Sequence, residues 1–257
     1  MTVAPVDAAT VIVVRTSDGT GSPWETYMIR RPVRSDFAAD VYVFPGGKVD
    51  AEDYDFPVAC EVSPIGAEPA TVLSEMERAL RVAAARELFE EIGIVLTNDS
   101  VTKGEWDSTK FDAWRHNLIA GRMSFGEVVR QLGVRIDLRQ IHPFSRWVTP
   151  RAFPRRYDTR FYVAYLPPGQ KPAPHASEAP EGLWIAPKEA LARYQSGQFP
   201  LVFATECHLL RMARYATVES MVASVTRDDL VPVTPQVVAD GGETRFLLPD
   251  DPGYTED

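Results

Sequence analysis

Three glutamates within residues 86–94 have the type and spacing needed to hold a metal ion. Glu90 and Glu91 follow Glu87 by three and four residues, so on a helix the three carboxylates would occupy neighbouring positions. Like charges so placed destabilise a bare helix, and a divalent cation would offset their repulsion. Mg²⁺ takes oxygen ligands and is usually shared between carboxylates and substrate phosphates. The spacing therefore indicates a cation site for a phosphorylated ligand. The alternative is a solvated acidic surface with Arg86 paired to Glu90.

The segment that carries these glutamates is predicted to be a helix over residues 77–94. Apolar residues recur there every four positions and would form one stripe against a core. They are Leu80, Ala84, Leu88 and Ile92. Gly46 and Gly47 follow a short strand predicted over residues 41–44, and glycine lets the backbone approach a ligand closely. The glycine pair and the acidic helix are therefore expected to face one site.

These residues together resemble the Nudix hydrolase family, whose signature is G-x5-E-x7-R-E-U-x-E-E-x-G-U, where U is a bulky apolar residue. The second half of the signature matches at Arg86, Glu87, Leu88, Glu90, Glu91, Gly93 and Ile94, and Phe44-Pro45-Gly46-Gly47-Lys48 matches the usual lead-in. The spacing departs from the signature, because Gly47 and Arg86 are 39 residues apart instead of 14. We attribute the excess to a proline-rich, irregular insertion over residues 51–75. Counting back from Arg86 places the first signature glutamate on Arg78, so that position is left unassigned.

The resemblance implies hydrolysis of a diphosphate linked to a second moiety, with Mg²⁺ or Mn²⁺ as the cofactor. Metal ligands would be the carboxylates of Glu87, Glu90 and Glu91 and the backbone carbonyl of Gly46. Arg86 would orient Glu90 rather than touch the substrate. A general base in this family often lies on a loop before a strand that contains tryptophan. Here Glu178 is the first choice on that loop and Glu181 the second, and for each the alternative is a plain surface acid.

Basic residues elsewhere could bind the substrate phosphates, because arginine pairs with phosphate through two parallel hydrogen bonds. The candidates are Arg30, Lys48, Arg155, Arg156 and Arg160. For Arg160 the alternative is an ion pair with an acid of this negatively charged chain.

Further features resemble the coenzyme A diphosphatase branch of the family, which carries a long insertion inside the signature. They are Trp147-Val148-Thr149-Pro150, residues 154–161 and residues 248–254. The substrate implied by this resemblance is coenzyme A or acyl-coenzyme A, cut to 3′,5′-ADP and a phosphopantetheine. One alternative is an ADP-ribose or NADH-type dinucleotide pyrophosphatase. The other is a binding protein without catalysis, which the complete glutamate triad disfavours.

The implied fold is α/β, with a mixed β-sheet sandwiched between α-helices in a single domain over residues 1–257. Besides the insertion, this domain would carry a helical segment over 105–135 and a C-terminal helical extension and tail over 187–257. The other strands are expected over 8–15, 25–31, 141–149, 160–166 and 182–186. The other helices are expected over 109–121, 124–132, 187–195 and 201–224, with a break in the last near Thr217.

Composition limits the class of protein further. The chain has 257 residues and a formal net charge of −9, which argues against a wide nucleic-acid-binding surface but allows a small phosphorylated substrate. Cys60 and Cys207 are too few for a disulfide framework or a four-cysteine zinc site. No segment reaches the roughly 18 apolar residues of a membrane span. We therefore expect a cytoplasmic protein whose partner is a small nucleoside diphosphate derivative, without nucleic acid or membrane. The resemblance also allows a homodimer.

Overall fold

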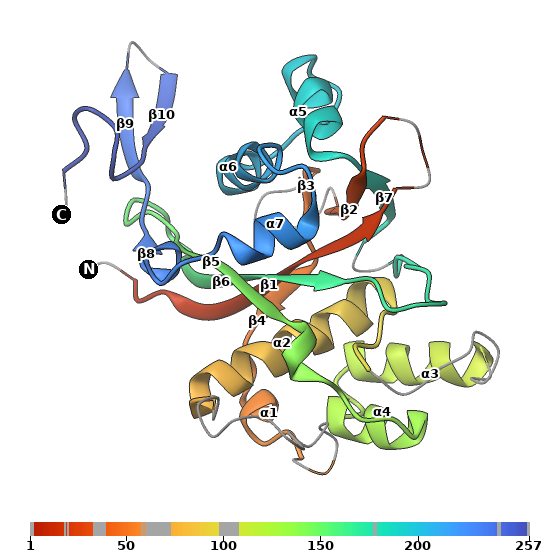
Figure 1. Ribbon diagram of the computed structural model, residues 1–257. Coiled ribbons are helices and arrows are strands. Elements are labelled where there is room, and N and C mark those ends of the chain that lie inside the picture. The colour runs from red at the N-terminus through yellow and green to blue at the C-terminus, as the bar shows by residue number, and fades with distance from the viewer. Residues whose placement is uncertain are drawn as a thin grey trace.

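The computed structural model describes residues 3–17, 19, 21–32, 40–57, 59, 73–97, 108–176, 179–240 and 243–255. Within these residues, eight strands form a mixed sheet in the order β3-β2-β1-β6-β5-β8, with β4 paired to β1 and β7 paired to β2 (Figure 1). The strands are β1 (Val6–Thr16), β2 (Trp24–Arg30), β3 (Tyr42–Val43), β4 (Gly46–Lys48), β5 (His142–Val148), β6 (Tyr157–Tyr165), β7 (Glu181–Ile185) and β8 (Pro232–Val233). A separate hairpin consists of β9 (Gln236–Asp240) and β10 (Glu243–Leu247).

Helices cover both faces of the main sheet. The helices are α1 (Ala51–Tyr54), α2 (Glu75–Ile92), α3 (Ser108–Ile119), α4 (Phe125–Leu132), α5 (Pro187–Gln195), α6 (Phe203–Met212) and α7 (Val218–Ala223). Figure 1 shows α1 to α4 on one side of the sheet and α5 to α7 on the other. This arrangement confirms the α/β sandwich expected from the sequence.

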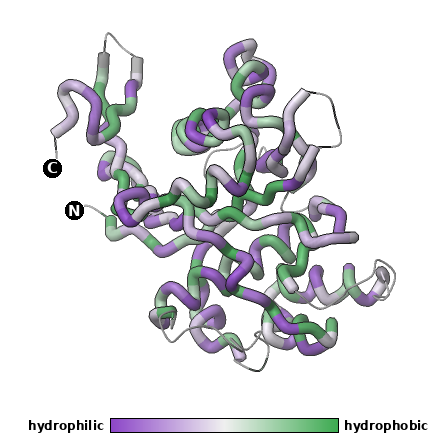
Figure 2. The backbone as a smooth tube through the Cα atoms, in the orientation of Figure 1, coloured by the Kyte–Doolittle hydropathy of each residue, from purple (hydrophilic) through white to green (hydrophobic). Residues whose placement is uncertain are grey.

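The strand β1 lies at the centre because its apolar residues serve both faces. It runs parallel to β6 and antiparallel to β2 and β4. Val11 and Val13 join the core under α2, whereas Ile12 and Val14 join the core under α6. Figure 2 shows hydrophobic residues concentrated along the central strands. Among the described residues, no helix is both long and apolar enough to cross a membrane.

The helix α2 carries the three glutamates and has clear signals at both ends. It begins at Glu75, two residues before the expected start, because the Ser74 side chain accepts the N–H of Glu77 and caps the first turn. It ends at Ile92, and Gly93 adopts the left-handed conformation with φ 67° that favours glycine. The predicted stretch over 201–224 divides into α6 and α7, and Thr217 caps the start of α7.

A buried histidine lies in the core under α6. His208 is 2% exposed and its ring stacks on Phe161 at 3.9 Å between ring centroids. Its Nδ1 faces the carbonyl of Ala204, which can only accept, so Nδ1 carries the proton. Its Nε2 therefore accepts a hydrogen bond from the Ser145 hydroxyl at 2.7 Å. The neutral ring is satisfied at both nitrogens; an added proton on Nε2 would reverse the Ser145 hydrogen bond and would place a positive charge in the core.

We expect this histidine to cost the protein stability as the pH falls. Burial lowers the pKa of His208 from 6.5 to about 4. Between these two pH values His208 is protonated in the unfolded chain but neutral in the folded chain. The free energy of unfolding is therefore highest above pH 6.5 and decreases as the pH falls towards 4. The loss amounts to about 3 kcal/mol.

Urea unfolding of the wild type and His208→Gln at pH 7, 5.5 and 4 measures this loss. The carboxylates titrate in both proteins, so the comparison isolates His208. The advantage of the wild type over the variant should shrink by about 3 kcal/mol between the first and last pH. A difference that stays constant with pH would show that His208 is not the cause.

Candidate functional site

A buried arginine organises the acidic end of α2. Arg86 is 6% exposed, and its Nε and Nη2 donate to the two carboxylate oxygens of Asp53 at 2.9 and 3.0 Å. Its Nη1 donates to Glu87 at 2.8 Å and to Glu90 at 3.3 Å. Nη2 also donates to the carbonyl of Lys48 at 2.8 Å. Arg86 therefore contacts Glu90, as expected, and joins it to Glu87, Asp53 and β4.

Asp53 was not predicted from the sequence as a site residue. This carboxylate is 1% exposed and also accepts the backbone N–H of Asp50 at 2.8 Å, in a capping box at the start of α1. Counting six residues forward from Gly47 would have found it, because Asp53 occupies the position of the first signature glutamate. The backward count from Arg86 failed because the additional residues follow Asp53. The expectation of an irregular insertion from residue 51 is therefore corrected: residues 51–54 form α1, and residues 58 and 60–72 lie outside the described residues.

The two glycines of β4 let the strand lie directly against the glutamates. The backbone N–H of Gly46 donates to a carboxylate oxygen of Glu91 at 2.8 Å. A Cβ on Gly47 would lie 2.2 Å from Oε1 of Glu87, and one on Gly46 would lie 2.4 Å from the carbonyl of Ala9. Gly46 therefore requires glycine, and a side chain at Gly47 would displace the Glu87 carboxylate. The contact of Gly46 with the acidic cluster is made by its amide, and the expected role of its carbonyl as a metal ligand stays a prediction.

The electrostatics of this site are those of crowded negative charge. Burial raises the pKa of Glu87 to about 7; Arg86 opposes the rise, and Glu90 and Asp53 add to it. A divalent cation would favour the ionised carboxylates and relieve this crowding.

The donor chemistry fits a hard divalent cation, because carboxylate oxygens are the ligands that Mg²⁺ and Mn²⁺ prefer. Glu87, Glu90 and Glu91 supply such oxygens around β4. In the described part of the chain, no three acidic, histidine or cysteine side chains already form a compact metal-binding group. The carboxylates instead contact Arg86 and the Gly46 amide, and a cation would share these oxygens.

Of the two candidates for the general base, the structure describes only Glu181. Glu178 lies outside the described residues. Glu181, on β7, accepts a hydrogen bond from the Tyr42 hydroxyl at 2.7 Å and from Arg30 at 3.4 Å. Arg30 also donates to Asp40 at 2.8 Å. Arg30 and Glu181 are thus brought together, but as partners of each other.

The arginines before and within β6 have mainly structural contacts. Arg160 pairs with Asp158 at 2.7 Å and with Asp7 at 3.1 Å, which matches the alternative considered from the sequence. Arg156, expected to bind substrate, is instead buried and donates to two backbone carbonyls, those of Thr149 and Val3. Its guanidinium thereby ties the N-terminal segment to the end of β5.

The other two cationic candidates are on the surface. Arg155 is exposed in the turn before β6, and Lys48 is exposed at the end of β4 beside the carboxylates. Their role towards a substrate stays a prediction.

Comparison with known proteins identifies the family of the chain. The family model for the NUDT19 Nudix domain matches residues 67–204, more than half of the chain. The chain belongs to the Nudix hydrolase family. Within that family it falls in the branch that includes the acyl-coenzyme A diphosphatases. Nudix hydrolases act on small nucleoside diphosphate derivatives and generally use divalent metal ions.

Individual relatives resemble the chain at modest identity. Acyl-coenzyme A diphosphatase NUDT19 of Gallus gallus is 28% identical over 310 residues, covering 97% of this chain and 81% of that protein. Putative nudix hydrolase 7 of Caenorhabditis elegans is 29% identical over 176 residues, covering 68% of this chain and 50% of that protein. The crystal structure of a Nudix hydrolase from Alicyclobacillus acidocaldarius has a TM-score of 0.71 at 27% identity, covering 87% of this chain and 97% of that structure.

Proposed function

We propose that the protein is a Mg²⁺- or Mn²⁺-dependent diphosphatase that hydrolyses coenzyme A or acyl-coenzyme A to 3′,5′-ADP and the corresponding phosphopantetheine. The observation that carries this proposal is the buried Arg86 network, which fixes Glu87 and Glu90 beside β4 while Glu91 contacts Gly46. The choice of substrate is supported by the acyl-coenzyme A diphosphatase of Gallus gallus, which is similar to this chain over nearly its whole length.

The reaction adds water across one phosphoanhydride bond, so its main obstacle is negative charge. A divalent cation bound at the site would neutralise the diphosphate and lower the pKa of a water molecule. Glu87, Glu90 and Glu91 would hold the ion, with Gly46 as a further candidate ligand. Arg86 would keep these carboxylates in place through its hydrogen bonds, which is the role of a positioning residue.

The proton of the attacking water needs an acceptor, and Glu178 remains the first candidate. Glu181 is less suited, because its carboxylate already accepts from Tyr42 and faces the guanidinium of Arg30. Both contacts engage carboxylate oxygens that a base would need for the attacking water. Glu178→Gln and Glu181→Gln, assayed separately, distinguish the two.

A substrate panel tests the proposal. The protein is incubated with Mg²⁺ or Mn²⁺ and with coenzyme A, an acyl-coenzyme A, ADP-ribose, NADH or a diadenosine polyphosphate, and the products are identified by mass. We expect the highest kcat/KM with coenzyme A or its acyl ester, 3′,5′-ADP as a product, and no turnover with excess chelator. Preferential cleavage of ADP-ribose or NADH would replace the proposed substrate. No turnover of any compound would favour a binding protein.

A further inference from the structure

A second buried arginine reaches the acidic helix from a different element. Arg115, on α3, is 3% exposed. Its Nε donates to the carbonyl of Glu90 at 2.9 Å, and its Nη1 donates to the carbonyl of Ala173 at 2.7 Å. The guanidinium therefore joins the last turn of α2 to a segment more than 50 residues away in the sequence.

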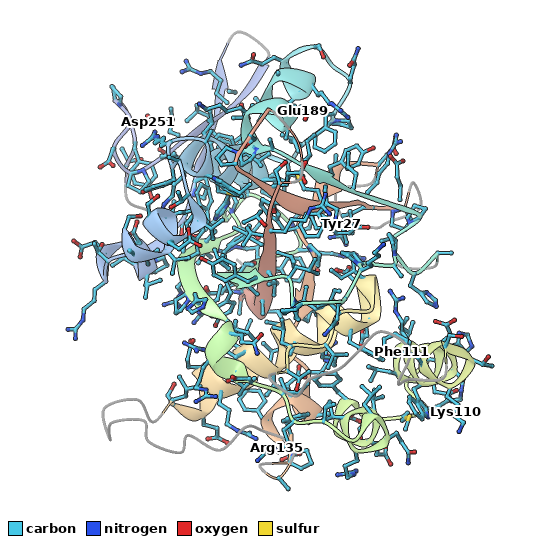
Figure 3. The ribbon with its side chains drawn as sticks, turned by 45° about the vertical axis from the view of Figure 1, so that its right-hand side comes forward. Tyr27, Lys110, Phe111, Arg135, Glu189 and Asp251 are labelled. Carbon is cyan, nitrogen blue, oxygen red and sulfur yellow. The ribbon has the colours of Figure 1, made fainter. Side chains whose placement is uncertain are left out.

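The helix α3 is held against α2 by an aromatic contact. The rings of Phe111 and Phe89 meet edge to face with centroids 5.1 Å apart. Figure 3 shows Phe111 on the side of α3 that faces α2, with Lys110 on the outer side. This contact sets the position of α3, so Arg115, one turn further along, reaches the end of α2.

The segment that Arg115 contacts runs beside the end of α2 and forms hydrogen bonds with it. The Gln170 side chain accepts from the N–H of Val95 at 2.9 Å and donates to its carbonyl at 2.7 Å. The N–H of Ala173 donates to the carbonyl of Ile92 at 2.8 Å, and that of His175 donates to the carbonyl of Glu91 at 3.0 Å. We call these contacts, with those of Arg115, the helix–loop clamp.

The clamp supplies partners to backbone groups that would otherwise lack them. The last four carbonyls of a helix have no intrahelical partner, and Glu90, Glu91 and Ile92 belong to that set. A cation is also favoured at a helix C-terminus, where the helix dipole is negative. Two of these carbonyls belong to residues whose side chains are the candidate metal ligands. Their backbone position therefore depends on the clamp.

The other side of the clamp leads to the candidate bases. The N–H of Ala179 donates to the carbonyl of His175 at 2.7 Å, and β7 begins at Glu181 two residues later. Ala179 is thus bonded to His175, which is itself bonded to α2. We propose that Arg115 is a positioning residue that holds residues 170–175 against the last turn of α2 and so fixes the backbone of Glu90 and Glu91. Its effect on turnover rests on the proposed function.

Arg115→Met tests this inference by two measurements. Hydrogen exchange reports the clamp directly: the amides of Ala173 and His175 should exchange at least tenfold faster than in the wild type. Steady-state kinetics report its effect: kcat should fall by on the order of 10- to 100-fold while KM stays within about threefold, because positioning is lost and substrate contacts are not. Arg115→Lys should recover part of kcat, since an ammonium keeps the charge but lacks the fork that reaches two carbonyls.

Two further variants separate positioning from general damage. Arg122→Met is the matched control, because Arg122 is exposed just after α3 and bonds the Asn117 side chain; it should leave both measurements unchanged. Gln170→Ala weakens the same clamp from the loop side, so it should lower kcat in the same way if Arg115→Met does not fold. The inference is overturned if the amides exchange at the wild-type rate in a folded Arg115→Met. The inference is also overturned if the amides of Ala173 and His175 exchange faster in Gln170→Ala or Arg115→Met while kcat remains within twofold of the wild-type value.

The exchange measurement also separates this inference from the proposed function. If the wild type turns over no compound of the panel, the proposed diphosphatase activity fails, but the clamp is still decided by exchange in Arg115→Met and Gln170→Ala. If the amides of Ala173 and His175 exchange slowly in the wild type and rapidly in both variants, Arg115 is upheld as the residue that fixes the loop to α2. Unchanged exchange would remove that role whatever the activity.

Discussion

Replacing Glu91 by glutamine is expected to lower kcat by on the order of a thousandfold while the protein remains folded. A metal ion contributes several kcal/mol of charge stabilisation to the transition state, and about 4 kcal/mol corresponds to a thousandfold in rate. Glutamine removes the negative charge but keeps a side-chain oxygen that can accept the Gly46 N–H, now bonded at 2.8 Å. The variant therefore removes the proposed ligand without removing the contact between α2 and β4.

The measurement is a Mg²⁺ titration of activity on the best substrate of the panel, with a thermal unfolding curve for each protein. Glu75→Gln is the control, because Glu75 is an exposed glutamate in the first turn of the same helix. The control should match the wild type in rate and metal dependence. An activity of Glu91→Gln within threefold of the wild type would contradict a role for Glu91 in metal binding.

Replacing Asp53 by alanine is expected to lower the free energy of unfolding by about 4 kcal/mol, because breaking a buried ion pair leaves the remaining charge without its partner. For a chain of this size, such a change lowers Tm by about 12 °C. Asp53 is 1% exposed and accepts two hydrogen bonds from Arg86, which is itself 6% exposed. Activity should also fall at a temperature where the variant is folded, because Arg86 then holds Glu87 and Glu90 less firmly.

Urea unfolding with Glu52→Gln as the control measures this effect, since Glu52 lies on the same short helix but is exposed. The control should change the free energy of unfolding by less than about 0.5 kcal/mol. If Asp53→Ala lost less than 1 kcal/mol, the pair with Arg86 would not be a main support of the site.

The parts of the site that the sequence predicted are those encoded locally. The carboxylates of Glu87, Glu90 and Glu91 are three and four residues apart on one helix, so spacing alone brings them together. The helix itself follows from its apolar period over residues 77–94, although the Ser74 cap starts it two residues earlier than expected. These relations span fewer than twenty residues.

The parts that were missed depend on contacts between distant residues. Asp53 and Arg86 are 33 residues apart, and an insertion of variable length hides their relation when the count starts from the arginine. Arg115 donates to backbone carbonyls 25 and 58 residues away, and no side-chain pattern marks a carbonyl as an acceptor. Arg156 was assigned to substrate because it is basic, whereas its acceptors are also backbone carbonyls. A buried arginine and a surface arginine look alike in a sequence until the backbone around them is known.

The pairing of Asp53 with Arg86 also bears on how this family can diversify. The signature places these two positions eight residues apart, and here they are 33 apart with the two-point contact intact. Closing a loop about four times longer costs only about 1 kcal/mol of chain entropy, which is less than the cost of breaking a buried ion pair. The stretch between them can therefore lengthen or be replaced while the glutamates stay in place.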